Sequence, residues 1–348
     1  MNPYVLMVFL SGLGLGTTLT FAGSHWLLAW MGLEINTLAI VPLMVQHHHP
    51  RAVEATTKYF LTQATAAAVI LFASSTNAWL TGDWGVGNTS SPVASTMIIA
   101  ALSLKVGLAP VHFWMPEVMQ GLSLLTGLIL STWQKLAPFA LIIQVAPTVN
   151  PLLLTVLGLM STLAGGWGGL NQTQLRKVLA YSSIAHMGWM VIVLQYAPHL
   201  TLLALLTYIF MTSAAFLALK SSSATKINTL AIAWSKSPVL AATTALVLLS
   251  LGGLPPLTGF MPKWLILQEL TKQSLPIAAA AMAFAALLSL YFYLRLCYAM
   301  ALTISPNTAA SATPWRLRTA QASLPLALST AVALALLPLT PAILMLVT

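Results

Sequence analysis

The chain has 348 residues, of which 58% are hydrophobic and only 5% are charged. Globular domains are typically about 25% charged and must cover a large surface, so this composition excludes an ordinary soluble protein. The balance is basic, with 14 Lys plus Arg against 5 Asp plus Glu, but no basic run with interleaved aromatic residues indicates nucleic-acid binding. The single cysteine, Cys297, excludes an internal disulfide and an iron–sulfur cluster held by this chain alone.

Stretches of about 20 mostly apolar residues, the length that crosses a bilayer, recur along the chain. No Lys or Arg precedes the first stretch, which predicts a spanning helix rather than a cleaved signal peptide. In chain order the stretches lie near 3–22, 25–45, 59–80, 94–115, 122–145, 149–170, 177–196, 199–220, 237–257, 275–298 and 323–346. The sequence therefore predicts an all-α polytopic membrane protein of about 11 helices that form a single transmembrane domain.

Basic residues gather in alternate connections between these predicted helices. The loops at 46–58, 171–177, 220–236 and 295–322 fall on the side of the N-terminus, whereas the opposite loops hold only Lys272. The basic residues of the first set are Arg51, Lys58, Arg176, Lys177, Lys220, Lys226, Lys236, Arg295, Arg316 and Arg318. Since short cytoplasmic loops carry an excess of Lys and Arg, we expect the N-terminus on the cytoplasmic side or its equivalent.

The sequence also contains an internal repeat. Segment 107–117, GLAPVHFWMPE, aligns without gaps with segment 253–263, GLPPLTGFMPK. One copy ends the fourth predicted helix and the other ends the ninth, so the two copies should run through the membrane in opposite directions. This pattern predicts an inverted five-helix repeat with one interrupted helix in each half. The first repeat would cover about 1–145 and the second about 149–298, followed by the helix at 323–346. Chance similarity of apolar, proline-containing segments is the alternative.

Four charged residues lie inside or beside predicted spans, and each needs a reason because a charge at the bilayer centre costs about 2.5–3.5 kcal/mol. They are Glu34, Lys105, Lys135 and Lys263. Burial favours the neutral form of a lysine and a nearby carboxylate favours the charged form, so such groups suit proton relay. Glu34 is the expected partner of Lys105. The alternative is a set of static ion pairs that lock helices together.

Two histidines are weaker candidates for the same relay. His186 lies among hydroxyl-bearing residues in the 177–196 helix and could join a hydrogen-bonded water chain, although a structural role is equally compatible with its position. His112 lies at the end of the 94–115 helix, where an interfacial structural role competes with relay. No dinucleotide fingerprint or convincing metal-ligand set is present, so we expect no cofactor or metal in this chain.

The segments LKVGLAPVHFWMPEV, QLRKVLAYSSIAHMGWM and LSLGGLPPLTGFMPKW resemble the antiporter-like subunits of respiratory complex I. The resemblance implies a membrane-arm subunit of a proton-translocating NADH:ubiquinone reductase in the mitochondrial inner membrane, with its N-terminus in the matrix. It implies that FMN, iron–sulfur clusters and ubiquinone belong to other subunits, and that the partners are membrane-arm subunits and lipids, including cardiolipin. Matched by position, Glu34 and Lys105 would form one half-channel, Lys135 the centre, and Lys263 the end of the second half-channel.

Two other functions remain open from the residues alone. A free-standing cation/proton antiporter would share the inverted repeat, but the spans contain few carboxylates that could bind a metal cation. A structural membrane-arm scaffold would use the same buried charges only to hold helices together.

Overall fold

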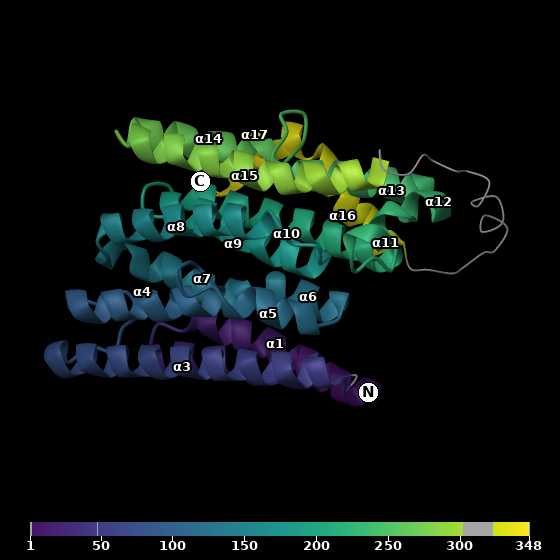
Figure 1. Cartoon of the computed structure of the whole chain (residues 1–348). Coiled ribbons are helices and arrows are strands. Elements are labelled where there is room, and N and C mark those ends of the chain that lie inside the picture. Colours follow the sequence, from purple (N-terminus) through teal and green to yellow (C-terminus); the bar gives the residue numbers. More distant parts are fainter. Residues whose placement is uncertain (1, 47, 302–322, 348) are drawn as a thin grey trace. The chain divides into compact units, whose positions relative to one another are not determined.

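The computed structural model describes residues 2–46, 48–301 and 323–347 of the chain, and these residues are mostly α-helical (Figure 1). Arg316 and Arg318, two of the predicted loop cations, lie outside the described residues. Seven described helices are long and apolar enough to cross a membrane, or eight if one bent pair is a single span. The predicted all-α membrane class is therefore confirmed, and each of the eleven predicted segments contains a helix.

The first of two compact units covers Met1–Gly158. Its helices are α1 (Pro3–Ala22), α2 (Trp26–Met44), α3 (Pro50–Thr81), α4 (Pro92–Val106), α5 (Trp114–Gly121), α6 (Leu124–Ser131) and α7 (Trp133–Val145), and α8 (Pro151–Gly169) reaches into the second unit. α3 begins nine residues before the predicted span, because Pro50 starts the helix and the His49 side chain caps it. α6 and α7 together fill the predicted 122–145 span, interrupted at Thr132.

The second unit covers Leu159–Thr348. Its further helices are α9 (Leu175–Val193), α10 (Pro198–Ser221), α11 (Ile227–Ala231), α12 (Ala233–Lys236), α13 (Pro238–Gly252), α14 (Phe260–Lys272), α15 (Pro276–Ala301), α16 (Leu324–Ala335) and α17 (Thr340–Val347). The predicted helix at 323–346 is bent by 66° between α16 and α17. Pro338 lies in the break, and a proline cannot donate the backbone hydrogen bond that a continuous helix needs.

The internal repeat recurs in the backbone with an offset of 146 residues. α4 and α13 both span 15 residues and begin at Pro92 and Pro238. Both end at a left-handed glycine: Gly107 has φ 84° and ψ 42°, and Gly253 has φ 84° and ψ 43°. After each glycine comes a short non-helical segment, and α5 and α14 then begin at Trp114 and Phe260. Both predicted interruptions are therefore present, whereas the opposite orientation of the two copies stays a prediction.

The hydrogen bonds that end the two helices follow the same offset. The amides of Gly107 and Leu108 both donate to the Ser103 carbonyl. In the second copy, the amides of Gly253 and Leu254 both donate to the Leu249 carbonyl. Such paired bonds to one carbonyl close a helix at a glycine, because glycine adopts positive φ without steric cost. The two breaks are thus the same backbone structure built from different side chains.

Candidate functional site

The first break surrounds Lys105, which lies in the last turn of α4. Its side chain is 5% exposed, and within the described residues Nζ has no hydrogen-bond partner. The indole Nε1 of Trp114 donates to the carbonyl of Leu104 at 2.9 Å and so connects the start of α5 to the end of α4. The ammonium group is therefore buried without a hydrogen bond to the described residues, a costly arrangement for a charged group.

Glu34 lies on α2 in the same unit and is partly buried. The Thr37 hydroxyl donates to Glu34 Oε2 at 3.3 Å. The charge of Glu34 acts electrostatically on Lys105, and the role of Glu34 as the relay partner of Lys105 stays a prediction. In the part of the chain that the structure describes, the ion pairs shorter than 4 Å are Lys58–Glu54, Lys58–Glu117 and Lys272–Glu269. Glu34 and Lys105 therefore form no ion pair among the described residues. Glu34 and Lys105 thus share a unit and interact without direct contact.

Lys135 lies in the first turn of α7, directly after the interruption at Thr132. It is 2% exposed, which makes it more buried than Lys105. Since α7 packs against both α2 and α4, the first unit brings the helices of Glu34, Lys105 and Lys135 into contact.

The second break positions Lys263 in the first turn of α14. Its Nζ donates to the carbonyls of Gly252 at 2.8 Å and Leu251 at 3.4 Å, at the C-terminal end of α13. These carbonyls form the negative end of a helix dipole, which favours a cation. Gly253 leaves room for this side chain, because a Cβ at that position would lie 3.0 Å from Nζ. The break therefore supplies the carbonyl partners of the ammonium group.

His186 and Lys263 line the same small cavity of about 20 Å³ in the second unit. Other lining side chains come from Trp189, Thr207 and Met211. A water molecule needs roughly 10–15 Å³ of such space, so the cavity has room for about one. The imidazole of His186 also contacts the ring of Tyr208, with ring centroids 5.5 Å apart. The weaker candidate His186 is thus placed beside one of the four principal residues.

His112 lies in the first break between α4 and α5. It is 7% exposed, and its ring stacks on Phe113 with centroids 4.4 Å apart. Its place in the same break as Lys105 is compatible with relay, and its stacking is compatible with a structural role.

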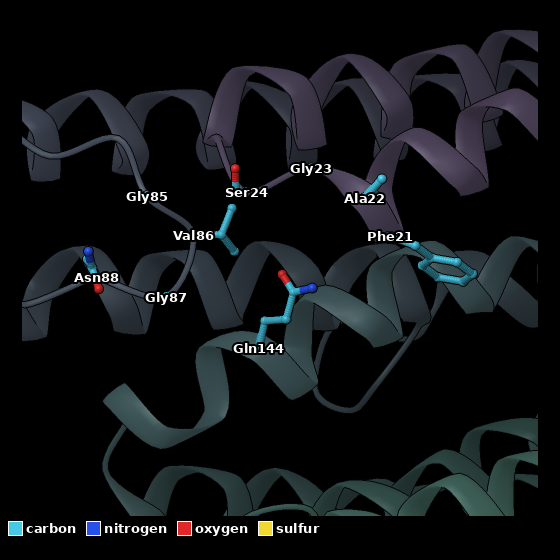
Figure 2. Close-up of a pocket in the computed structure, with 9 residues that line it drawn as sticks. All are labelled: Phe21, Ala22, Gly23, Ser24, Gly85, Val86, Gly87, Asn88 and Gln144. Atoms are coloured by element: carbon cyan, nitrogen blue, oxygen red, sulfur yellow. The ribbon is translucent and has the colours of Figure 1, made fainter.

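A larger groove of about 510 Å³ lies at one end of the first unit (Figure 2). Its polar side chains are those of Ser24, Asn88 and Gln144, and the rest of its lining is apolar or glycine. Because no titratable side chain lines this groove, it offers no acid or base.

Sequence analysis missed three uncharged polar residues that connect the helices of the first unit. Gln134 on α7 bonds to Asn36 on α2, and Tyr59 on α3 bonds to Gln134. The available signal was the presence of amides inside apolar runs, next to the charged residues in LEINT and WQKL. No group of three or more His, Cys, Asp or Glu suited to a metal ion occurs among the described residues.

Comparisons with known proteins cover the whole chain. Residues 23–289 match the family model for the NADH:quinone oxidoreductase/Mrp antiporter transmembrane region, and residues 290–344 match that for the NADH dehydrogenase subunit 2 C-terminus. NADH-ubiquinone oxidoreductase chain 2 of Carassius auratus is 79% identical over 348 residues, with 100% of both chains covered. The protein of the same name from Danio rerio is 73% identical over 348 residues, again with 100% of both covered.

Solved structures share this fold. A chain of respiratory complex I from Thermus thermophilus has a TM-score of 0.87 at 29% identity, covering 99% of this chain and 80% of that one. A chain of the Mrp complex from Dietzia sp. has a TM-score of 0.82 at 17% identity, covering 95% of this chain and 74% of that one. The second likeness shows the fold alone.

Proposed function

Because the chain belongs to the NADH-ubiquinone oxidoreductase chain 2 family, we propose that Glu34, Lys105, Lys135 and Lys263 carry protons through it. The chain is a multi-pass membrane-arm subunit of a proton-translocating oxidoreductase. The proposal assigns the proton path to particular side chains. NADH oxidation and ubiquinone reduction, with FMN and iron–sulfur clusters, take place in other subunits, and their energy reaches this chain through electrostatic and conformational coupling.

The environment of Lys105 is the observation that carries the proposal. An ammonium group that is 5% exposed and has no hydrogen-bond partner within the described residues is poorly stabilised, so it gives up a proton readily when the charge of Glu34 changes. The energy of such a charge interaction is comparable with the energy needed to move a proton across the membrane. One charge that crosses a membrane at 100 mV involves about 2.3 kcal/mol. A change in one buried charge interaction is of the same order.

In the second unit, Lys263 and His186 serve the same purpose. A single water in their shared cavity would join the imidazole to the ammonium group and complete a hydrogen-bonded connection. The carbonyls of Gly252 and Leu251 stabilise Lys263 when it is charged. His112 has the corresponding place near Lys105 in the first break, and we assign it a secondary role in relay.

The proposal extends to the location, the domain organisation and the partners of the chain. The chain lies in the mitochondrial inner membrane as a single antiporter-like domain, with repeats at about 1–145 and 149–298 and a C-terminal helix at about 323–346. Its N-terminus faces the matrix, which the basic loops on that side support. Its partners are other membrane-arm subunits and lipids, including cardiolipin.

The test replaces Lys105 or Lys263 with Met in the intact complex, with the chain supplied from a recoded gene. Met retains much of the length and removes the charge, so we expect a lower proton-to-electron ratio, measured in proteoliposomes during NADH oxidation. Lys272→Met is the matched control, because Lys272 is 62% exposed and pairs with Glu269 outside the proposed path. Unchanged ratios and rates in both test variants would remove the proposed path.

The two other functions predict different results. A cation/proton antiporter would exchange Na⁺ or K⁺ for H⁺ in vesicles that contain the isolated chain, and the fold likeness to an Mrp complex makes this comparison worthwhile. A structural scaffold would tolerate Lys→Met changes once assembled, so the amount of complex would fall while the proton-to-electron ratio per complex stayed normal.

A further inference from the structure

A buried hydrogen-bonded bridge joins three helices of the first unit. Gln134 Nε2 on α7 donates to Asn36 on α2, at 3.3 Å to the backbone carbonyl and 3.2 Å to Oδ1. The Tyr59 hydroxyl on α3 donates to Gln134 Oε1 at 3.5 Å. The exposed fractions of Asn36, Tyr59 and Gln134 are 2%, 2% and 9%. One side-chain amide thus connects α7 to two other helices from a buried position.

Two members of this bridge lie beside charged residues. Asn36 follows Glu34 by two positions on α2, and Gln134 directly precedes Lys135 on α7. The charge of Glu34 also acts on the hydroxyl of Tyr59. The bonds of Gln134 therefore set the separation between the helix that carries Glu34 and the helix that carries Lys135.

Tyr59 extends the bridge towards Lys105. Its ring packs against Trp114, with centroids 5.8 Å apart and planes at 59°. Trp114 in turn donates to the carbonyl of Leu104, which directly precedes Lys105 on α4. The helices of Glu34, Lys105 and Lys135 are therefore connected through neutral groups one or two positions from the charge.

We propose that Gln134 is a positioning residue whose amide, held between Tyr59 and Asn36, keeps Lys135 at proton-transfer distance from Glu34 and Lys105. This inference rests on the proposed function. Within the described residues Glu34 and Lys105 form no direct ion pair, so the separation of their helices cannot depend on that contact. An amide keeps the same donors and acceptor at every working pH, so the bridge holds whichever group carries the proton.

The experiment compares three variants in the intact complex in proteoliposomes. Gln134→Met keeps the side-chain length and removes all three hydrogen bonds, whereas Tyr59→Phe keeps the ring on Trp114 and removes the hydroxyl. Gln63→Met is the matched control: Gln63 is 3% exposed on α3, and within the described residues its Nε2 has no hydrogen-bond partner. The readouts are the proton-to-electron ratio and the solvent deuterium isotope effect on turnover, both per assembled complex.

For Gln134→Met we expect a lower ratio, a larger isotope effect and proton-coupled turnover slower on the order of tenfold, because a misplacement of about 1 Å can cost about a hundredfold. Tyr59→Phe should give a smaller change of the same kind, and Gln63→Met none. A purely structural bridge would lower the amount of complex and leave both readouts normal. That result, or an equal loss in Gln63→Met, would overturn the proposal. If the complex that contains Gln134→Met does not assemble, the result for Tyr59→Phe decides between a positioning role and a purely structural role.

Lys105→Met, measured in parallel, separates this inference from the proposed function. If Lys105→Met lowers the ratio and neither bridge variant does, the positioning role is wrong and the proton path stands. If Lys105→Met leaves the ratio unchanged, the path itself is wrong and the positioning role falls with it.

Discussion

The two breaks hold their lysines in different ways. At the second break, Lys263 Nζ bonds to carbonyls at the end of α13. At the first, the indole of Trp114 occupies the carbonyl of Leu104, and Lys105 Nζ has no hydrogen-bond partner within the described residues. Equivalent backbones therefore give one ammonium group fixed partners and leave the other dependent on the charge of Glu34. This difference suits a path in which Lys105 releases its proton when the charge of Glu34 changes, whereas Lys263 retains its proton through its carbonyl partners.

A residue outside the membrane-spanning helices gives a pH prediction. Asp83 accepts hydrogen bonds from the Gly85 amide at 2.8 Å and from Asn88 Nδ2 at 2.7 Å, and these bonds hold the pKa of its carboxyl below the usual value. A lowered pKa stabilises the loop at and above the ordinary Asp pKa of about 3.9, and that contribution is lost as pH falls through the lowered pKa. The protection of residues 82–91 against hydrogen exchange, corrected for the intrinsic exchange rate at each pH, should therefore fall below about pH 4.

Asp83→Asn provides the comparison for this prediction. Its exchange rate, corrected for intrinsic chemistry, should already be raised at neutral pH and should change little on acidification. Equal protection of the loop in both proteins at neutral pH would show that the carboxylate does not stabilise it.

The sequence identified charged residues more readily than neutral ones. Glu34, Lys105, Lys135 and Lys263 are conspicuous because a charge inside an apolar run carries a known cost. Gln134 and Asn36 are 98 positions apart, and amides occur in spans for many reasons, so no local pattern pairs them. Their connection depends on how α2 and α7 pack, which a reading of single helices does not contain.

At the level of helices, glycine and proline in the sequence marked where the helices are interrupted. They did not show which helices and bends come after the interruptions. The interruptions predicted within the 94–115 and 237–257 spans begin at Gly107 and Gly253, which end α4 and α13, since left-handed backbone favours glycine. α14 was missed because the predicted span ended at 257 and its polar residues were assigned to a loop. The bend at Pro338 was also missed, because its surroundings are apolar enough for one continuous span.

Gly259 gives a prediction for the second break. A Cβ there would collide with the Ser250 carbonyl and lie 3.1 Å from Met211 Sδ. Gly259→Ala should therefore push α13 and α14 apart and destabilise the break by about 1–3 kcal/mol, the usual cost of overpacking. We expect less assembled complex and faster thermal inactivation.

Gly87→Ala is the control for Gly259→Ala, since a Cβ at Gly87 meets nothing within 4 Å. It should leave assembly and inactivation unchanged. Normal assembly and normal thermal inactivation of Gly259→Ala would mean that the break can widen without cost.

At the level of the whole chain, the two units contain the same type of break and different charges around it. The first unit contains Glu34, Lys105 and Lys135, whereas Lys263 and His186 lie in the second. The repeat explains why each unit has an interrupted helix, but it does not place the lysines, because Lys263 aligns with Glu117 and Lys105 aligns with Leu251. Under the proposed function, the units contribute successive parts of one path rather than two independent paths.

A double variant tests this single path. Lys105→Met and Lys263→Met should each lower the proton-to-electron ratio, and the double variant should match the more severe single variant, because a path blocked once carries nothing further. The measurement is the ratio in proteoliposomes, normalised to NADH oxidation. Losses that add would indicate two independent paths, one in each unit.

Under the proposed function, the small cavity beside His186 also limits which ions can pass through the chain. Its volume of about 20 Å³ leaves no room for a sodium or potassium ion with its hydration shell. Among its described lining side chains, only that of Thr207 carries an oxygen atom that could replace part of that shell, so entry of a metal cation would require a dehydration that the walls barely compensate. Hydrogen ions need no such room, since they advance by exchange of bonds along a water. Under the proposed function, selectivity against metal cations would follow from the size of this cavity and from its mostly apolar lining.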